Sequence, residues 1–581
     1  MVFFDHAWTL ILQITKKNHE DVKVLLREKI TYPKLRIDNY GYVLYIPAPR
    51  KTGNNTVTYQ GMHLNLSDDH HKRVLWQMFK ASTYHLSAHV VVSNYNHYRK
   101  WIKHKNIKNA MFAICIAEDA IANAYLKAKW NFLIPEIAIA NAISYLRLKP
   151  ASHIRKEPLI LRAAILSENI AGKVKGIKIK REVIETAEKT SKMLKELENK
   201  AYESFKMTEK SEETEKILEA LIDKKIGVAD SIYNILSRFD ETSQIPSLPY
   251  TDNHGENSLF YKKVPEEESI MKIAKKTYQI LEPEKGEPDT KLFVETFYED
   301  DISQIFSNWK SSQERKNKII AKYKELGKET RFLAYEFPEE DYTEYLRRRM
   351  LLGSPIRRIL EKLRLLKNVT GEDFRREAGL VDLQEAIQVI ASKSQRTDIF
   401  VREELQTRED RWVILVDTSR SLKFFTGEVR DIALCLAEVA KNLIINQNAW
   451  AMYAFNNKFY IIKDFSETFS SKVKARIGGL KHGGMSYIPD AIKIAFEALK
   501  GHIEESKVIV VVSDFFPSGY EEIESELAQT VKKLERLGIG MLGIGVKSRA
   551  VRKFFRFNCV VEEPYELMKK FTKAFIEYSS I

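Results

Sequence analysis

Three oxygen-bearing side chains, Asp417, Ser419 and Ser421, occupy alternate positions directly after an apolar run in the stretch WVILVDTSRSLKF. Two further oxygen groups stand at comparable places. Ser486 lies in the loop HGGMSYIPD, just before a helical pattern, and Asp514 ends the run VIVVVSD. Carboxylate and hydroxyl oxygens are ligands for hard cations such as Mg²⁺ and suit zinc poorly. The sequence therefore predicts a site for Mg²⁺ or a similar divalent ion, made by these five residues.

The elements that must position these residues alternate between strands and helices from about Asp410 onward. Runs rich in valine and isoleucine, such as KVIVVVSD, are typical of strands that are covered on both faces. Strands joined through helices form parallel sheets with right-handed crossovers. We therefore expect a doubly wound, Rossmann-like α/β domain over residues 405–581. Ligands bind at the carboxyl ends of the strands in such a sheet, where Asp417 and Asp514 fall.

The five oxygen residues resemble the metal-ion-dependent adhesion site of von Willebrand factor A (VWA) domains. That family has the pattern D-x-S-x-S, then a Thr in a second loop and an Asp in a third. The matching positions here are Asp417, Ser419, Ser421, Ser486 and Asp514. The resemblance implies a bound cation with an open coordination position, which a carboxylate from a partner completes. The resemblance therefore implies a site that recognises a partner, and nothing in the sequence suggests catalysis at it.

Two positions depart from the VWA pattern. Ser486 replaces the usual Thr, so the hydroxyl is kept but the methyl group that restricts its rotamer is lost. Arg420 occupies a position that is commonly small, and its guanidinium would lie close to the cation. It would either weaken cation binding or attract an acidic partner.

Segments beyond the metal site resemble proteins of the NorD/CbbO type, which are partners of MoxR-class AAA+ ATPases. The resemblance implies a non-catalytic adaptor or co-chaperone that couples the ATPase to a client enzyme for remodelling, metal insertion or activation. No G-x-x-x-x-G-K-[ST] motif occurs, so the chain itself is not expected to be an ATPase or another enzyme. The similar segments are AEDAIANAYL with Glu118 and Asp119, REAGLVDLQEAIQVI with Glu377, Gly379 and Asp382, and TREDRW with Arg408 and Arg411.

The chain is long enough for several domains. We expect a helical domain over residues 1–170, long charged helices and linkers over 171–300, and a helical segment over 301–404 that leads into the VWA domain. The stretch 172–238 is dense in Lys and Glu with sparse apolar positions, which indicates a long exposed helix or a helical hairpin.

Charge leaves two alternative functions open. The 93 basic side chains exceed the 79 acidic ones, for a net charge of +14, which suits an anionic partner. A Ro-like RNA-binding protein also joins a helical region to a VWA domain, and YLRRRMLLGSPIRRILEKLRLLK would suit phosphates. Because neither a helical repeat nor an aromatic-basic RNA motif is found, nucleic acid is possible but not favoured. A chelatase-type VWA subunit is the other alternative, although it would carry a long acidic linker.

Other features indicate a cytoplasmic protein. Only three cysteines occur, far apart and without a CxxC pair, which fits a reducing compartment. The N-terminal stretch MVFFDHAWTLILQITKK lacks a basic region and a cleavage site, so it is expected to be a first helix. No apolar run reaches the ~18 residues of a membrane span.

A histidine pair suggests a second site. His85 and His89 lie at i, i+4 in YHLSAH, a spacing that lets two imidazoles share a metal ion. Glu118 and Asp119 lie on the next predicted helix, which is mostly apolar, and buried carboxylates there need partners. These four residues are a possible transition-metal site. The alternative, favoured by the sequence alone, is carboxylate–imidazole hydrogen bonding in a helical core, or surface histidines.

Overall fold

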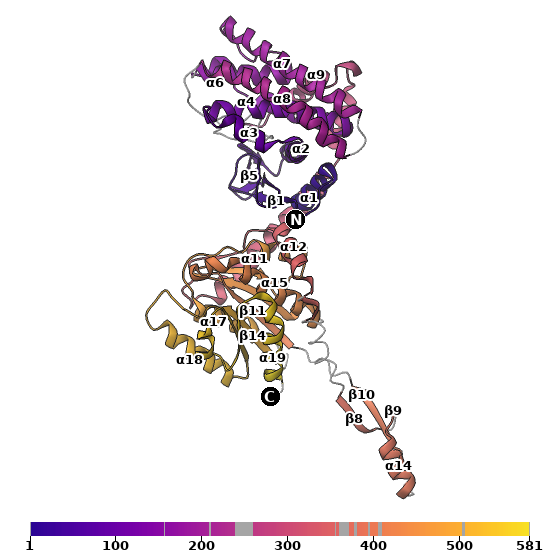
Figure 1. Cartoon of the computed structure of the whole chain (residues 1–581), viewed down its shortest axis with the longest axis vertical. Coiled ribbons are helices and arrows are strands. Elements are labelled where there is room, and N and C mark those ends of the chain that lie inside the picture. Colours follow the sequence, from indigo (N-terminus) through magenta and orange to yellow (C-terminus); the bar gives the residue numbers. More distant parts are fainter. Residues whose placement is uncertain are drawn as a thin grey trace. The chain divides into compact units, whose positions relative to one another are not determined.

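The chain forms two compact units, Met1–Gln313 (unit 1) and Glu314–Ile581 (unit 2), each with its own apolar core (Figure 1). Unit 1 is mainly helical, and unit 2 is an α/β unit built on a mixed, mostly parallel sheet. The computed structural model describes all residues except 1, 156, 208–210, 239–258, 355, 359–370, 377–379, 393–395, 405–409, 445, 502–505, 580 and 581.

Unit 1 begins with a helix and two small sheets. The prediction of a helical region missed the strands, because they are short and a few residues show too little periodicity. β6 (Met62–Asn65) alternates strictly, with Met62 and Leu64 buried and the other two side chains exposed. The elements are α1 (Val2–Thr15), the sheet β1 (Val22–Arg27), β3 (Tyr42–Pro47) and β2 (Lys34–Ile37), and the sheet β4 (Arg50–Lys51), β5 (Thr56–Tyr59) and β6.

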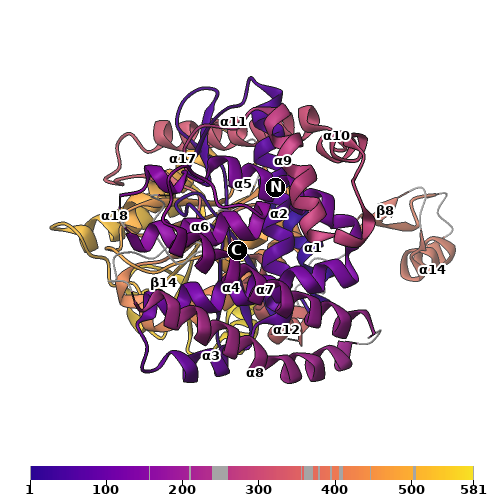
Figure 2. The same cartoon turned by 90° about the horizontal axis from the view of Figure 1, so that it is seen from above.

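The remainder of unit 1 is helical, and its helices pack on one another around a common core (Figure 2). α4 is buried on most of its faces, as its continuous apolar composition predicts. The helices are α2 (Asp69–Val92), α3 (Tyr95–Ile102), α4 (Ile107–Lys129), α5 (Ile134–Arg147), α6 (Glu157–Ala171), α7 (Arg181–Lys206), α8 (Ser211–Leu236), α9 (Glu267–Leu281), α10 (Thr290–Tyr298) and α11 (Ile302–Leu326), which runs across the boundary between the units.

The charged stretch 172–238 is the helix pair α7 and α8. The apolar positions of α7 form a stripe, Val183, Ala187, Leu194 and Leu197 among them, which is buried against α4 and α6 in the core of unit 1. The long charged helices therefore belong to the same unit as residues 1–170, and the expected division at 170 is absent. Most charges of α7 lie on its outer face, which is why its composition is typical of an exposed helix, but Lys195 and Glu198 line a cavity inside unit 1.

Unit 2 contains a seven-stranded sheet in the order β16-β15-β14-β11-β12-β13-β7. The five strands from β16 to β12 pair in parallel, β13 returns antiparallel beside β12, and β7 pairs in parallel with β13. The strands are β7 (Tyr335–Glu336), β11 (Asp410–Asp417), β12 (Trp450–Phe455), β13 (Phe459–Lys463), β14 (Ser506–Ser513), β15 (Gly540–Val546) and β16 (Phe557–Val561).

Helices cover both faces of this sheet. Trp412, Ile414 and Val416 of β11 enter a core formed with α15 and α19, whereas Val413 and Leu415 enter a second core formed with α17 and α18. This burial on alternate sides explains the unbroken apolar runs. The helices are α12 (Tyr342–Leu351), α14 (Leu383–Ser392), α15 (Thr426–Leu443), α16 (Ser471–Gly478), α17 (Ile488–Lys500), α18 (Ile523–Arg536) and α19 (Leu567–Ser579).

The region 301–404, predicted to be helical, also contains strands. β8 (Gly371–Arg376), β10 (Phe400–Glu404) and β9 (Leu380–Val381) form an antiparallel three-stranded sheet, and α14 lies between β9 and β10 in the chain. Within the residues that the structure describes, none of the helices has the length and apolar character needed to cross a membrane.

Candidate functional site

The carboxyl ends of β11 and β14 bring the predicted oxygen residues together. The two strands are parallel neighbours in register from Asp410 and Ser506 onward, and they end at Asp417 and Ser513. The sequence predicted Asp514 as the last residue of β14, but the strand ends at Ser513 and Asp514 follows it directly.

Asp417 forms the centre of the cluster. It is fully buried, and its Oδ1 accepts the backbone N–H of Ser419 at 2.8 Å. Its Oδ2 accepts the hydroxyl groups of Ser486 and Ser513, each at 2.6 Å. Burial and the nearby carboxylate of Asp514 raise the pKa of Asp417 to about 6. A cation between the two carboxylates would relieve this repulsion.

The hydroxyl groups continue from this centre toward solvent. Ser419 is buried and Ser421 is exposed, and their Oγ atoms lie 3.0 Å apart. Ser486 is buried and lies two residues before α17. The five predicted residues thus lead from a buried carboxylate to the surface, and they fit a hard cation that keeps part of its water shell.

Backbone contacts hold the loops of the site in register. The N–H of Arg420 donates to the carbonyl of Gly484 at 3.0 Å, while the Arg420 side chain is exposed to solvent. Gly484 has φ +76°, and a Cβ there would lie 2.2 Å from Oδ1 of Asn457. Only glycine satisfies both conditions, so Gly484 fixes the loop that carries Ser486 against the loop that carries Arg420.

Sequence reasoning missed Ser513. Its hydroxyl donates to Asp417 and accepts the backbone N–H of Phe515 at 2.9 Å. Phe515 is a buried non-glycine residue with φ +56°, a strained backbone conformation of the kind found at functional sites. The sequence does carry a signal for Ser513. In VVVSD it is a polar residue at the last position of an otherwise apolar strand, directly before Asp514.

Exposed apolar side chains stand on the same three loops. Phe424, Met485 and Phe516 are 92%, 49% and 60% exposed. Phe424 follows Ser421 by three positions, and the other two lie within two positions of site residues. We call these three side chains the apolar rim. Large exposed apolar side chains around a polar centre are typical of surfaces that bind another protein.

The histidine pair lies in the core of unit 1. Nε2 of His85 is 2.9 Å from Asp119 Oδ1, and Nε2 of His89 is 3.1 Å from the same oxygen. Nδ1 of His89 is 2.7 Å from Glu118 Oε1. All four side chains are buried. Although burial opposes it, hydrogen bonding to Asp119 and Glu118 raises the pKa of His89 to about 10. The four residues are thus in mutual contact as carboxylate–imidazole pairs.

The other segments noted in the sequence have mixed outcomes. Asp382 is a helix cap, since its carboxylate accepts the N–H of Glu385 at the start of α14. Arg411 is buried in β11, with its guanidinium over the ring of Phe465. Glu377, Gly379 and Arg408 lie outside the described residues.

Comparison with known proteins adds no family. Neither a scan of protein-family models nor a search of curated proteins found a match to this chain.

Proposed function

We propose that the chain is a non-catalytic adaptor. Its unit 2 would be a VWA-type domain that binds a partner protein through a Mg²⁺-dependent site. One observation carries the proposal. Five oxygen residues meet at the carboxyl edge of a doubly covered sheet, and exposed apolar side chains stand on the same three loops. Ion storage alone would not need that apolar rim, whereas a protein interface would.

Asp417, Ser419, Ser421, Ser486 and Asp514 are the residues that would hold the ion. When bound, Mg²⁺ would supply positive charge with an open position for a carboxylate of the partner. Ser486 and Ser513 orient the Asp417 carboxylate, because both hydroxyls donate to the same oxygen. The apolar rim excludes water from the contact, which strengthens a charge-assisted interaction relative to an exposed ion pair.

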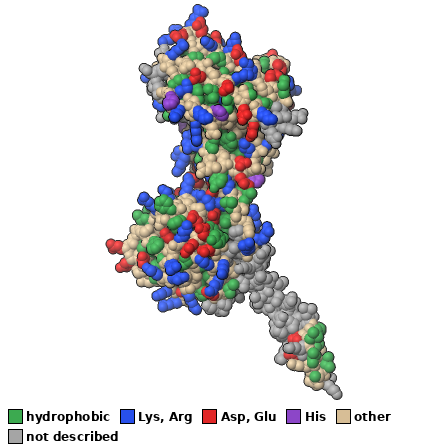
Figure 3. Space-filling view, in the orientation of Figure 1, with side chains coloured by type: hydrophobic (Ala, Val, Ile, Leu, Met, Phe, Trp, Pro, Cys, Tyr) green, Lys and Arg blue, Asp and Glu red, His purple; other side chains and the backbone are tan. Residues whose placement is uncertain are grey.

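We further propose that the partners are a MoxR-type AAA+ ATPase and a client enzyme, as the NorD/CbbO resemblance implies. An exposed amphipathic helix supports an adaptor role. Leu383, Ile387 and Ile390 recur at the spacing of one face of α14, and each is more than half exposed. Figure 3 shows hydrophobic side chains gathered on the surface of this segment. Such a face is suited to the groove of another protein. Unit 1 would then recognise the client.

RNA binding receives less support from the structure. Two arginines of the basic segment pair with carboxylates of unit 2. Arg348 donates to Asp431 at 2.8 Å and to Glu344 at 2.7 Å, and Arg349 lies 3.4 Å from Glu438. Arginines that already pair with carboxylates are less free to contact phosphates.

We expect the tagged full-length chain to capture an AAA+ ATPase from native cells in Mg²⁺ after crosslinking, and to lose it in chelator. Asp417→Asn and Phe424→Ser should each reduce capture at least tenfold. Asp417→Asn removes a ligand that the ion needs, and Phe424→Ser removes an apolar side chain that excludes water from the contact. Leu537→Ser is a matched control. Leu537 is also exposed but precedes β15, at the opposite edge of the sheet.

Mass spectrometry of the captured proteins gives the readout. Recovery of RNA or other proteins in place of an AAA+ ATPase, unchanged by chelator and by both variants, would overturn the adaptor proposal.

A further inference from the structure

The buried histidine cluster of unit 1 has the arrangement of a metal site and is independent of the function proposed for unit 2. His85 and His89 lie one turn apart on α2, and Asp119 faces them from α4. One nitrogen from each imidazole and one oxygen of Asp119 lie within 4.8 Å of one another. Both Nε2 atoms point at a single oxygen, Asp119 Oδ1. A cation could take the place of the protons that now join these three atoms.

Glu118 fixes the orientation of one imidazole. Its Oε1 contacts Nδ1 of His89 at 2.7 Å and also accepts the hydroxyl of Ser93. Its Oε2 accepts the hydroxyl of Tyr98 and lies 3.9 Å from Nζ of Lys225. A carboxylate held this firmly keeps the proton on Nδ1 of His89 and leaves Nε2 available to coordinate. Metal-ligating histidines commonly have such a carboxylate behind them.

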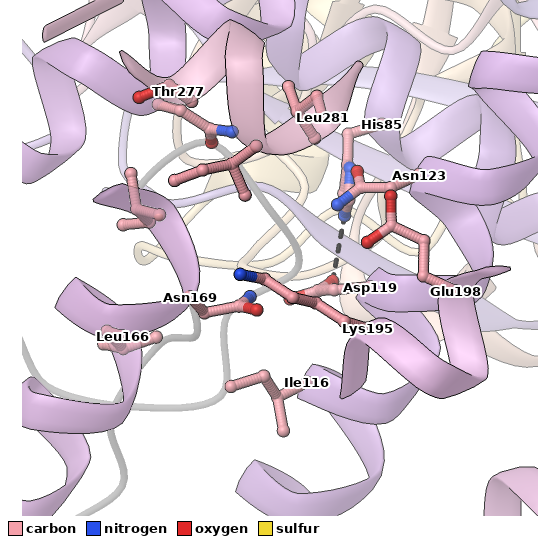
Figure 4. A pocket seen from close by; sticks show the side chains of 13 residues that line it. His85, Ile116, Asp119, Asn123, Leu166, Asn169, Lys195, Glu198, Thr277 and Leu281 are labelled. Carbon is pink, nitrogen blue, oxygen red and sulfur yellow. Dashed lines mark hydrogen bonds and ion pairs between the residues drawn. The ribbon is translucent and has the colours of Figure 1, made fainter. Parts of the chain in front are cut away.

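A cavity of about 30 Å³, lined by both polar and apolar side chains, adjoins the cluster (Figure 4). His85 and Asp119 line it, together with Asn123, Lys195, Glu198 and Thr277. Thr277 is 1% exposed, and its hydroxyl has no hydrogen-bond partner in the described part of the chain. A cavity of this size can hold a water molecule, and a buried hydroxyl needs such a hydrogen-bond partner.

We propose that His85, His89 and Asp119 bind a transition-metal ion, with Glu118 as the positioning residue and an open coordination site facing the cavity. Two imidazoles and one carboxylate suit Zn²⁺ or Fe²⁺, and they exclude Mg²⁺ and Ca²⁺ as preferred ions. The open position takes water or a small anion, which Asn123, Lys195, Glu198 and Thr277 would surround. Metal binding displaces the proton on Nε2 of His89, so the affinity falls as pH falls.

Co²⁺ is the probe for this site. The full-length chain, purified without a histidine tag and stripped with chelator, should develop visible d–d absorption that saturates at one Co²⁺ per chain and is displaced by Zn²⁺. X-ray absorption of the Co²⁺ protein should show two imidazole ligands. The His85→Ala/His89→Ala variant should lose the absorption, and Glu118→Gln should weaken binding by roughly 10- to 100-fold while keeping the spectrum.

Two matched controls separate this site from others. His71→Ala changes a histidine on the same helix that bonds to the backbone of Asn65, and Asp417→Asn removes the centre of the Mg²⁺ site. Both should bind Co²⁺ as the wild type does. Absence of saturable absorption in the wild type, or a spectrum with oxygen ligands alone, would overturn the proposal. Because these two readouts come from the wild type, they stand even if a variant fails to fold.

Discussion

Replacing Asp417 by Asn should raise the melting temperature of unit 2 in chelator and abolish its further rise in Mg²⁺. The pKa of Asp417 is raised from 3.8 to about 6, so keeping it ionised costs on the order of 3 kcal/mol at neutral pH. Asn removes that cost, and the hydroxyls of Ser486 and Ser513 can rotate to accept from its amide. We expect a gain of up to about 3 kcal/mol in the unfolding free energy, and scanning calorimetry measures it.

The stability difference between the wild type and Asp417→Asn should change with pH in one direction. Because the folded-state pKa of Asp417 is raised, the folded chain binds more protons than the unfolded chain between pH 3.8 and about 6. In chelator, the wild type should therefore lose stability relative to Asp417→Asn as pH rises through this window. Saturating Mg²⁺ should restore about 3 kcal/mol to the wild type alone, as expected for a ligand at ~100 times its dissociation constant.

Asp464 provides a control of opposite sign. Although burial opposes it, hydrogen bonds from Ser466 and Tyr323 and the charge of Lys322 lower its pKa to about 2. Asp464→Asn should therefore destabilise unit 2 equally in chelator and in Mg²⁺. A similar loss in both conditions for Asp417→Asn would show that Asp417 is a structural aspartate and would contradict the cation site.

The second large effect concerns Glu118 in unit 1. Glu118→Ala should lower the unfolding free energy of unit 1 by about 3–5 kcal/mol, because it leaves Lys225 as a buried charge without its carboxylate and removes one of the two carboxylates that contact His89. The hydroxyls of Ser93 and Tyr98 also lose their acceptor. Urea unfolding followed by helical circular dichroism measures the change.

Glu185→Ala is the matched control, because Glu185 pairs with Arg181 on the exposed face of α7. Its loss should cost less than about 1 kcal/mol. Similar small losses for both variants would mean that the buried cluster contributes no more than a surface ion pair.

The candidate site of unit 2 is largely predictable from the sequence because strand ends are visible in it. Long Val/Ile runs mark buried strands, and the first polar residues after them fall at one edge of a parallel sheet. The strand pattern alone therefore places Asp417 and Asp514 at that edge, whereas Ser486, which precedes a helix, was placed there by its match to the VWA pattern. Ser513 was missed because it is still inside the strand, where a side chain is expected to pack against a helix.

Unit 1 was less predictable. Its short strands between residues 22 and 65 carry too few residues to establish a period, so a helical region was predicted there. The buried apolar stripe of α7 was not predicted, because Lys and Glu outnumber the apolar side chains that face the core. For the histidine pair, the i, i+4 spacing indicated one helix face, but the contacts with Glu118 and Asp119 depend on how α2 and α4 pack, which periodicity does not determine.

The function proposed for unit 2 requires that the oxygen cluster at the edge of the sheet hold a divalent cation. Electron paramagnetic resonance of Mn²⁺ tests it most directly, since bound and free Mn²⁺ give different signals. The wild type and His89→Ala should each bind one Mn²⁺ per chain that Mg²⁺ displaces, and Asp417→Asn should bind none at that affinity. Mn²⁺ binding that is absent from the wild type, or unchanged by Asp417→Asn, would contradict a cation site at Asp417.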